Sequence, residues 1–192
     1  MKTTEQTKFI ILTGIKHSGK SSLGKILAEK INYKFIDLDD VIEEISNLSC
    51  RSLYNQKGKA GFQAVELEAC QKIYNNLYIN TPVNTVIATG GGICNNSQAF
   101  KLLKSFGIVI YLKVSEDISC NRIIEASEKR GSYPPYIVQA LQNNETSAEN
   151  VCKIFHPYYK EITAKYEQLA DIIVPLTNET KQKNAQRLLD AL

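Results

Sequence analysis

Short apolar runs alternate along this chain with longer stretches in which apolar residues recur every three or four positions. A short bounded apolar run is typical of a buried strand, and the longer periodic stretches predict amphipathic helices. The expected strands are residues 8–13, 34–37, 85–88, 108–112 and 171–174. Alternation of strand and helix from end to end predicts a single α/β domain, in which helices cover both faces of a parallel sheet.

The periodic stretches predict the helices that connect these strands. They cover residues 20–32, 41–45, 51–57, 62–78, 97–105, 118–124, 148–170 and 181–192. Periodicity fails at 127–149, which contains Gly131, Pro134, Pro135 and a polar run at 142–146. A long segment of this kind in a compact domain is usually functional or disordered, and beside a ligand site it predicts a lid.

The stretch between the first strand and the first helix predicts the chemistry. Residues 14–21 satisfy G-x-x-x-x-G-K-[ST], the phosphate-binding loop of nucleotide enzymes. A helix N-terminus that follows such a loop directs unpaired N–H groups and a positive dipole at an anion. Lys20 is expected to reach the β- and γ-phosphates, and the Ser21 hydroxyl to bind Mg²⁺. The other nucleotide-binding candidates are Gly14, Lys16, His17, Ser18, Gly19 and Ser22.

His17 occupies a free position of this pattern. A role as a spacer on the loop surface is therefore the stronger interpretation of this residue, although it stands among the ligand-binding candidates.

Two further clusters lie where expected strands end. Three carboxylates, Asp37, Asp39 and Asp40, follow the second strand, and three glycines at 90–92 follow the third. Ligands of open α/β sheets bind at the carboxyl ends of the strands, where the phosphate loop also lies. We therefore favour a functional role for the carboxylates over simple helix capping. For the glycines we favour a loop that approaches a ligand over a flexible turn.

The composition excludes several functional classes and indicates no additional ligand or metal site. Hydrophobic residues make up 43% of the 192 and charged residues 22%, which is ordinary for a globular protein. A net charge of +3 without a Lys/Arg run argues against nucleic-acid binding, and no apolar run resembles a signal peptide or a membrane span. Five widely spaced cysteines without a Cys-x-x-Cys pair suggest neither a disulfide framework nor a zinc site. With two histidines, we expect no metal beyond Mg²⁺, in a reducing cytoplasm.

These parts together are those of phosphoryl transfer: a phosphate cradle, a lysine, a hydroxyl for Mg²⁺, carboxylates and a lid. Asp37 is expected to hold Mg²⁺ through water, because Mg²⁺ keeps much of its hydration shell. Asp39 is expected to orient and deprotonate an acceptor hydroxyl. The lid would exclude water, which otherwise competes as the acceptor.

Several motifs match one enzyme family in order and spacing. They are the phosphate loop, Phe35-Ile36-Asp37-Leu38-Asp39, Gly58-x-x-x-Phe62-x-x-x-Glu66, Thr89-Gly90-Gly91-Gly92, Val109-Ile110-Tyr111-Leu112 and Tyr166-Glu167-Gln168-Leu169-Ala170-Asp171. In these motifs the chain resembles the shikimate kinase family over nearly its whole length. The resemblance implies a five-stranded parallel sheet of the nucleoside-monophosphate-kinase type. It also implies ATP with Mg²⁺, and phosphorylation of shikimate to shikimate 3-phosphate in aromatic amino-acid biosynthesis.

The resemblance also implies roles for particular residues. Lys20 and Asp39 would be catalytic, and Gly90, Gly91 and Gly92 would contact the substrate through their backbone. Arg122 matches a position whose arginine lies against adenine, and a plain solvated arginine is nearly as good an interpretation. Residues 39–80 would form the substrate-binding segment, in a protein that is expected to be a monomer.

Two departures from the family pattern concern the carboxylate of shikimate. The family carries a carboxylate-binding arginine after Phe62, where this chain has Gln63. A second such arginine falls on Ile162, or on Phe155 if the motif is aligned on the sequence His-Pro-Tyr-Tyr. Neither glutamine nor isoleucine replaces a bidentate guanidinium–carboxylate pair. Glu66, the usual partner of the first arginine, must find another partner or face solvent.

A third departure lies in the lid. The family carries Arg-Pro there, and this chain has Tyr133-Pro134, with Lys129 and Arg130 upstream as substitutes. The nucleotide half of the site is therefore intact, whereas the acceptor half is altered.

Three interpretations stay open. Shikimate still binds, and its carboxylate meets Lys160, Lys165, His156 or a lid cation. Alternatively, the acceptor is another hydroxylated small molecule without that carboxylate. A third interpretation, a nucleotide-binding regulatory module that has lost transfer, is the weakest, because the lysine, the serine and both aspartates of the site are present.

Overall fold

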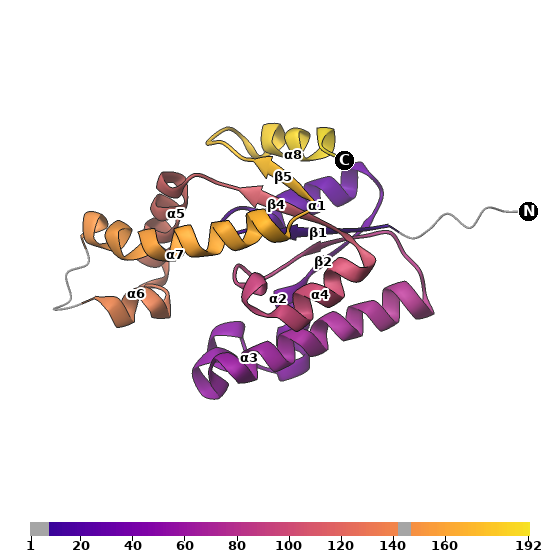
Figure 1. Ribbon diagram of the computed structural model, residues 1–192, viewed down its shortest axis with the longest axis horizontal. Helices are drawn as coiled ribbons and strands as arrows, with labels where there is room; N and C mark the ends of the chain where they lie inside the picture. The colour runs from indigo at the N-terminus through magenta and orange to yellow at the C-terminus, as the bar shows by residue number, and fades with distance from the viewer. Residues whose placement is uncertain (1–7, 142–146) are drawn as a thin grey trace, which may run out of the picture.

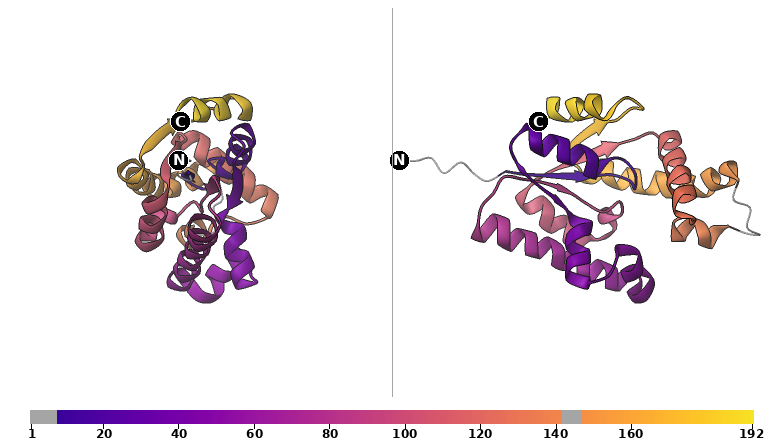
Figure 2. Two further views of the ribbon diagram at one scale, coloured as in Figure 1. Left: turned by 90° about the vertical axis from the view of Figure 1, so that its right-hand side faces the viewer. Right: turned by 180° about the vertical axis from the view of Figure 1, so that it is seen from behind.

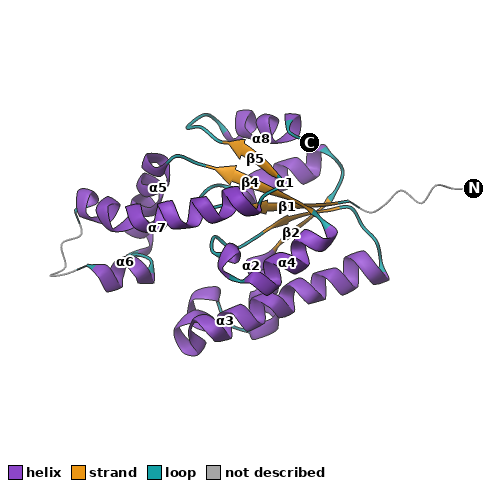
Figure 3. Ribbon diagram, viewed as in Figure 1, coloured by secondary structure: helices purple, strands orange, loops and turns teal. Residues whose placement is uncertain are grey.

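Five strands form one parallel sheet in the order β2-β3-β1-β4-β5 (Figures 1 and 3). The computed structural model describes residues 8–141 and 147–192. The strands are β1 (Phe9–Thr13), β2 (Lys34–Asp37), β3 (Thr85–Ala88), β4 (Ile108–Lys113) and β5 (Ile172–Pro175). Ile11 of the central strand pairs with Ile87 on one side and Val109 on the other. Every residue of β1 is buried, which explains why it appears in the sequence as an unbroken apolar run. The predicted α/β class and the predicted strands are confirmed.

The connecting helices begin where the sequence places capping residues. They are α1 (Lys20–Lys30), α2 (Leu38–Ser46), α3 (Cys50–Tyr74), α4 (Ser97–Phe106), α5 (Glu116–Arg130), α6 (Pro135–Ala140), α7 (Ala148–Leu169) and α8 (Lys181–Asp190). A π-helical turn, η1 (Asn75–Asn80), and a 3₁₀ turn, η2 (Ile93–Asn95), complete the chain. Side-chain oxygens of Asp37, Ser49, Asn96, Ser115 and Thr180 accept bonds from the N-terminal backbone of their helices, which supplies acceptors for N–H groups that lack partners. Within the described part of the chain, no helix is both long and apolar enough to cross a membrane.

Two apolar cores lie on opposite faces of the sheet. Phe9 and Ile11 of β1 belong to the larger core with residues of α3, α4 and α7. Ile10 and Leu12 belong to the smaller core with residues of α1 and α8. Successive side chains of a strand point to opposite faces, so one strand serves both cores (Figures 1 and 2). This packing leaves the carboxyl ends of the strands uncovered for a ligand.

The segments expected at 51–57 and 62–78 both lie within α3, whose backbone is non-helical at Gly58 (φ 66°, ψ −172°), so that two helices meet there at a kink. The break expected between the two segments is therefore present, and glycine tolerates its backbone conformation. The end expected at residue 78 was wrong, because α3 ends at Tyr74 and η1 follows it. The segment expected to lack structure at 127–149 instead contains the end of α5 and the whole of α6. The polar run at 142–146 lies outside the described residues.

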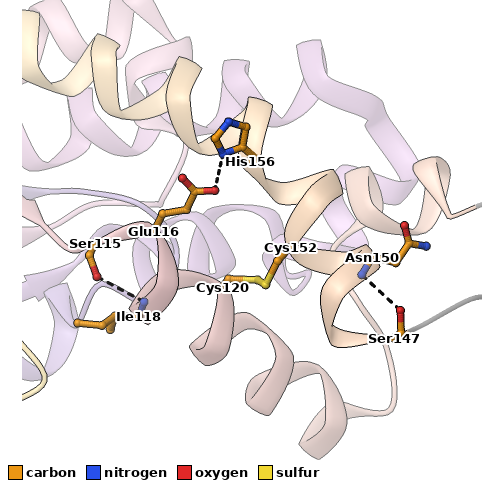
Figure 4. The surroundings of a disulfide bond; sticks show 8 residues. All are labelled: Ser115, Glu116, Ile118, Cys120, Ser147, Asn150, Cys152 and His156. Carbon is orange, nitrogen blue, oxygen red and sulfur yellow. Dashed lines mark hydrogen bonds and ion pairs between the residues drawn. A yellow bond between two sulfur atoms is a disulfide. The ribbon is translucent and has the colours of Figure 1, made fainter.

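The cysteine prediction was also wrong. Cys120 of α5 and Cys152 of α7 form a disulfide, with their Cα atoms 5.8 Å apart (Figure 4). The two helices pack side by side, and the imidazole of His156 on α7 contacts the carboxylate of Glu116 on α5 at 2.7 Å. A separation of 32 residues shows no motif in the sequence, because the pairing depends on how α5 and α7 meet. The other three cysteines are free.

Candidate active site

The loops that follow β1, β2 and β3 meet at one edge of the sheet, because these strands are neighbours in it. They border a cleft of about 1040 Å³. The cleft brings together most of the predicted site residues, which are Lys16, His17, Ser18, Gly19, Lys20, Ser21, Ser22, Asp39, Gln63, Glu66, Gly90, Gly91, Gly92 and Arg122. Gly14 and Asp37 do not line it, but both contact residues that do. Residues distant in the sequence thus share one cavity large enough for a nucleotide and a small acceptor.

Lys20 is held inside the phosphate loop. Its ammonium group donates to the carbonyl of Gly14 at 2.9 Å and to that of Ile15 at 3.0 Å. Burial lowers the pKa of Lys20 to about 8, although the charges of Asp39 and Asp37 oppose that shift. The ammonium group therefore already lies inside the loop in which a phosphate would bind.

His17 is uncharged near neutral pH. Burial, followed by the positive charges of Lys16 and Arg130, lowers its pKa to about 4. Its backbone adopts a positive φ of 63°, and its carbonyl accepts a bond from Nη1 of Arg122 at 3.1 Å. These contacts favour the spacer role for His17. They place Arg122 against the phosphate loop, and its contact with adenine stays a prediction.

Two oxygen atoms that could bind a metal, on Ser21 and Asp37, lie side by side where Mg²⁺ is expected. The hydroxyl of Ser21 donates to Oδ2 of Asp37 at 2.6 Å. The other carboxylate oxygen of Asp37 accepts the backbone N–H of Asp39 at 3.1 Å, which orients it at the start of α2. Mg²⁺ prefers oxygen ligands and usually takes few from the protein, with water and phosphate oxygens supplying the rest. The pair fits a magnesium site of this kind.

Asp39 has the character of a proton acceptor. Burial and the neighbouring charge of Asp37 raise its pKa, while Lys20 and Lys16 act in the opposite direction. Its carboxylate lies against the backbone of Gly90, where an added Cβ would come within 3.1 Å of Oδ1. A raised pKa increases the basicity of the carboxylate toward a substrate hydroxyl.

The triple-glycine loop touches the phosphate loop directly. A Cβ on Gly91 would lie 2.7 Å from the backbone nitrogen of Lys16, a distance that a side chain cannot occupy without displacing the backbone. The hydroxyl of Tyr166 donates to the carbonyl of Gly91 at 3.0 Å. The ring of Tyr166 stacks on that of Tyr111 with centroids 5.2 Å apart. Glycine permits the close approach of the two loops, and the Tyr166 bond holds the triple-glycine loop in place.

Glu66 has found a new partner. Nδ2 of Asn96 donates to Oε2 of Glu66 at 2.9 Å and to the carbonyl of Gln63 at 2.8 Å. The amide of Gln63 donates to the carbonyl of Asn95 at 2.7 Å. The pKa of Glu66 is raised to about 7, mainly by burial and to a smaller extent by the charge of Asp39, while the Asn96 bond acts in the opposite direction. Sequence reasoning missed Asn96, whose signal was its place as a capping residue before α4.

The position of the second carboxylate-binding arginine is closed to the cleft. Phe155 and Ile162, its two candidates, are both fully buried in the larger core. Of the substitutes expected from the sequence, His156 contacts Glu116 at 2.7 Å and Lys165 contacts Glu161 at 2.6 Å. Lys160 does not line the cleft.

Arg51 is a cleft residue that sequence reasoning did not single out. It stands in the first turn of α3 and lines the cavity. Nη1 donates to Oγ of Ser132 at 2.8 Å, and Nη2 donates to the carbonyl of Tyr133 at 3.1 Å. These bonds connect α3 with the segment between α5 and α6. In the sequence, nothing separates Arg51 from other surface arginines.

Comparisons with known proteins identify the family of this chain. A family model described as Shikimate kinase matches residues 16–192. A shikimate kinase from a Sulfurihydrogenibium species is 30% identical over 176 residues, which cover 92% of this chain and 99% of that protein. A shikimate kinase from Bacteroides thetaiotaomicron has a similar fold, with a TM-score of 0.75 at 24% identity over 95% of this chain and 97% of that one. Another from Acinetobacter baumannii, solved in complex with shikimate, has a TM-score of 0.75 at 22% identity over 97% and 93%. The chain belongs to the shikimate kinase family.

Proposed function

We propose that this protein transfers the γ-phosphoryl group of ATP to a ring hydroxyl of shikimate. The observation that carries the proposal is that Lys20, the Ser21–Asp37 pair, Asp39 and the triple-glycine loop meet at one cleft. Relatives named shikimate kinase, matched over most of this chain, support the choice of acceptor.

The residues divide the reaction between them. The loop N–H groups and Lys20 hold the phosphates and neutralise the charge that develops during transfer. Asp39 accepts the proton of the acceptor hydroxyl while the hydroxyl oxygen bonds to the γ-phosphorus. The bond from the γ-phosphorus to the bridging oxygen breaks, and ADP is released. Ser21 and Asp37 would hold Mg²⁺, which when bound neutralises phosphate charge. Residues 127–141 are proposed to act as the lid, since several residues of this segment line the cleft.

A second candidate acceptor is a hydroxylated small molecule without a carboxylate. The bond from Gln63 to Asn95 and the burial of Phe155 favour it, because neither position offers a cation to the cleft. Under this alternative, Asp39 and the triple-glycine loop keep their roles and the acceptor binds through its hydroxyls alone.

The test is ADP release from ATP and Mg²⁺ with shikimate, compared with a blank without acceptor. Turnover well above the blank, abolished in Lys20→Ala, supports the proposal. ATP binding without any turnover on shikimate would refute it, and a panel of uncharged polyols and sugars then tests the second candidate.

Cytoplasmic location and a monomeric state stay predictions. A disulfide is uncommon in a reducing cytoplasm, so the Cys120–Cys152 bridge makes the location worth measuring.

A further inference from the structure

We propose that Arg51 of α3, together with Arg130 of α5, forms an anion subsite that binds the carboxylate of the acceptor. This inference rests on the proposed function, because it concerns the acceptor of the same reaction. It assigns to two arginines, from two different helices that border the cleft, the charge that Gln63 and Phe155 do not supply.

The guanidinium of Arg51 is fixed in place before any ligand binds. Its two bonds, to Oγ of Ser132 and to the carbonyl of Tyr133, hold it against the segment between α5 and α6. A guanidinium has five N–H donors in a rigid plane, so these two bonds leave donors for an anion. Among the described residues, no ion pair involves Arg51, and its charge is therefore uncompensated by a carboxylate.

Arg130 adds a second charge to the same part of the cleft. The pKa of Lys16 is lowered, first by burial and then by the charge of Arg130, with a smaller contribution from Arg51. Asp39 acts in the opposite direction on Lys16. Both arginines therefore lie within electrostatic reach of the phosphate loop, and all three cations line the cleft. An anion bound among them would relieve their mutual repulsion.

The position of Arg51 favours the acceptor over the nucleotide as the source of that anion. Arg51 follows Cys50, whose sulfur lies 3.7 Å from the carbonyl of Asp39, so the first turn of α3 packs beside the proposed base. Tyr54 and Phe62 of α3 also line the cleft, so this helix borders it over several turns. The nucleotide side has its own cation, Lys20, inside the loop.

Of the other cations that the sequence offered for this carboxylate, Lys129 lines the cleft beside Arg130 and Lys160 does not line it, while two have carboxylate partners. The charge of Lys165 is paired with Glu161, and its ammonium also donates to Oδ1 of Asn95 at 2.8 Å. His156 contacts the carboxylate of Glu116 and does not line the cleft. Among the described residues, the arginines that line the cleft are Arg51, Arg122 and Arg130. Arg122 is bonded to the carbonyl of His17 in the phosphate loop, which leaves Arg51 and Arg130 for the acceptor.

The experiment compares shikimate with its uncharged methyl ester in the full-length protein, by direct binding titration and by steady-state turnover. In Arg51→Gln we expect affinity for shikimate to fall at least about tenfold, with affinity for the ester unchanged. Arg51→Lys should recover only part of the loss, because an ammonium lacks the planar fork. Arg130→Gln should act in the same direction. Lys57→Gln, which removes a charge from an exposed position of α3 outside the cleft, is the matched control.

Each outcome decides the subsite separately from the proposed function. Equal losses for acid and ester, or no loss for either, overturn the carboxylate assignment. A raised KM for ATP with an unchanged KM for shikimate also overturns it, since the guanidinium would then serve phosphate. Preferential binding of the acid without turnover supports the subsite and contradicts the proposed function. Turnover at equal efficiency on the acid and the ester supports the proposed function and contradicts the subsite.

Discussion

Glu66 offers the sharpest test of the electrostatics of this cleft. The side chain is 3% exposed, and burial is the main cause that raises its pKa from an ordinary 4.5 to about 7. A carboxyl whose pKa rises on folding costs stability wherever the unfolded chain would ionise it. The cost is absent below about pH 4.5, grows between 4.5 and 7, and is constant above about pH 7.

The substitution Glu66→Gln removes this cost and keeps the shape. The pKa difference from 4.5 to about 7 corresponds to about 3 kcal/mol, at about 1.4 kcal/mol for each pH unit. The amide oxygen of glutamine can still accept the bond from Nδ2 of Asn96. We therefore expect the variant to be more stable than the parent by up to about 3 kcal/mol at pH 8, and by less than about 0.5 kcal/mol at pH 4.5.

The assay is urea unfolding followed by circular dichroism at both pH values, without ATP or acceptor. Glu68→Gln is the matched control, because Glu68 is exposed on the same helix and its replacement should change little at either pH. A stability change in Glu66→Gln that is the same at pH 4.5 and pH 8, or a loss at pH 8, would refute the reasoning.

Three further predictions follow from the same contacts. Gly91→Ala should reduce kcat/KM at least about tenfold, because its Cβ would meet the phosphate-loop backbone at 2.7 Å. Gly92→Ala, whose nearest contact is at 4.0 Å, is the control and should be nearly neutral. Equal activities in the two variants would contradict this prediction. Because Lys20 has a pKa of about 8, it is mostly uncharged at pH 9, and ATP binding there should take up close to one proton. Calorimetry in buffers of different ionisation enthalpy measures this uptake. Zero uptake would exclude Lys20 as the group that pairs with the phosphates. Cys152→Ser should lower the free energy of unfolding by about 3–4 kcal/mol, since the bridge to Cys120 closes a long loop; a thiol titration that finds no bridged pair in the parent would remove the premise.

Much of the candidate site could be predicted from local sequence. The phosphate loop, the carboxylates after β2 and the glycines after β3 are contiguous segments, each next to an apolar run that predicts a strand. Parallel strands place their carboxyl ends at one edge, so the convergence of Lys20, Asp39 and Gly90 followed from the strand pattern. The break between the segments 51–57 and 62–78 was predicted and lies at Gly58. The helical parts of 127–149 were not predicted, because they depend on packing between helices.

The acceptor half was beyond local reasoning for a physical reason. The residue types at each position, including the lack of arginine at 63 and 155, are visible in the sequence. The pairing of Asn96 with Glu66, the burial of Phe155 and the bonds of Arg51 to Ser132 and Tyr133 arise from folding. Contacts between distant segments set burial and pKa, and burial is a property of the packed cores rather than of any single stretch of chain.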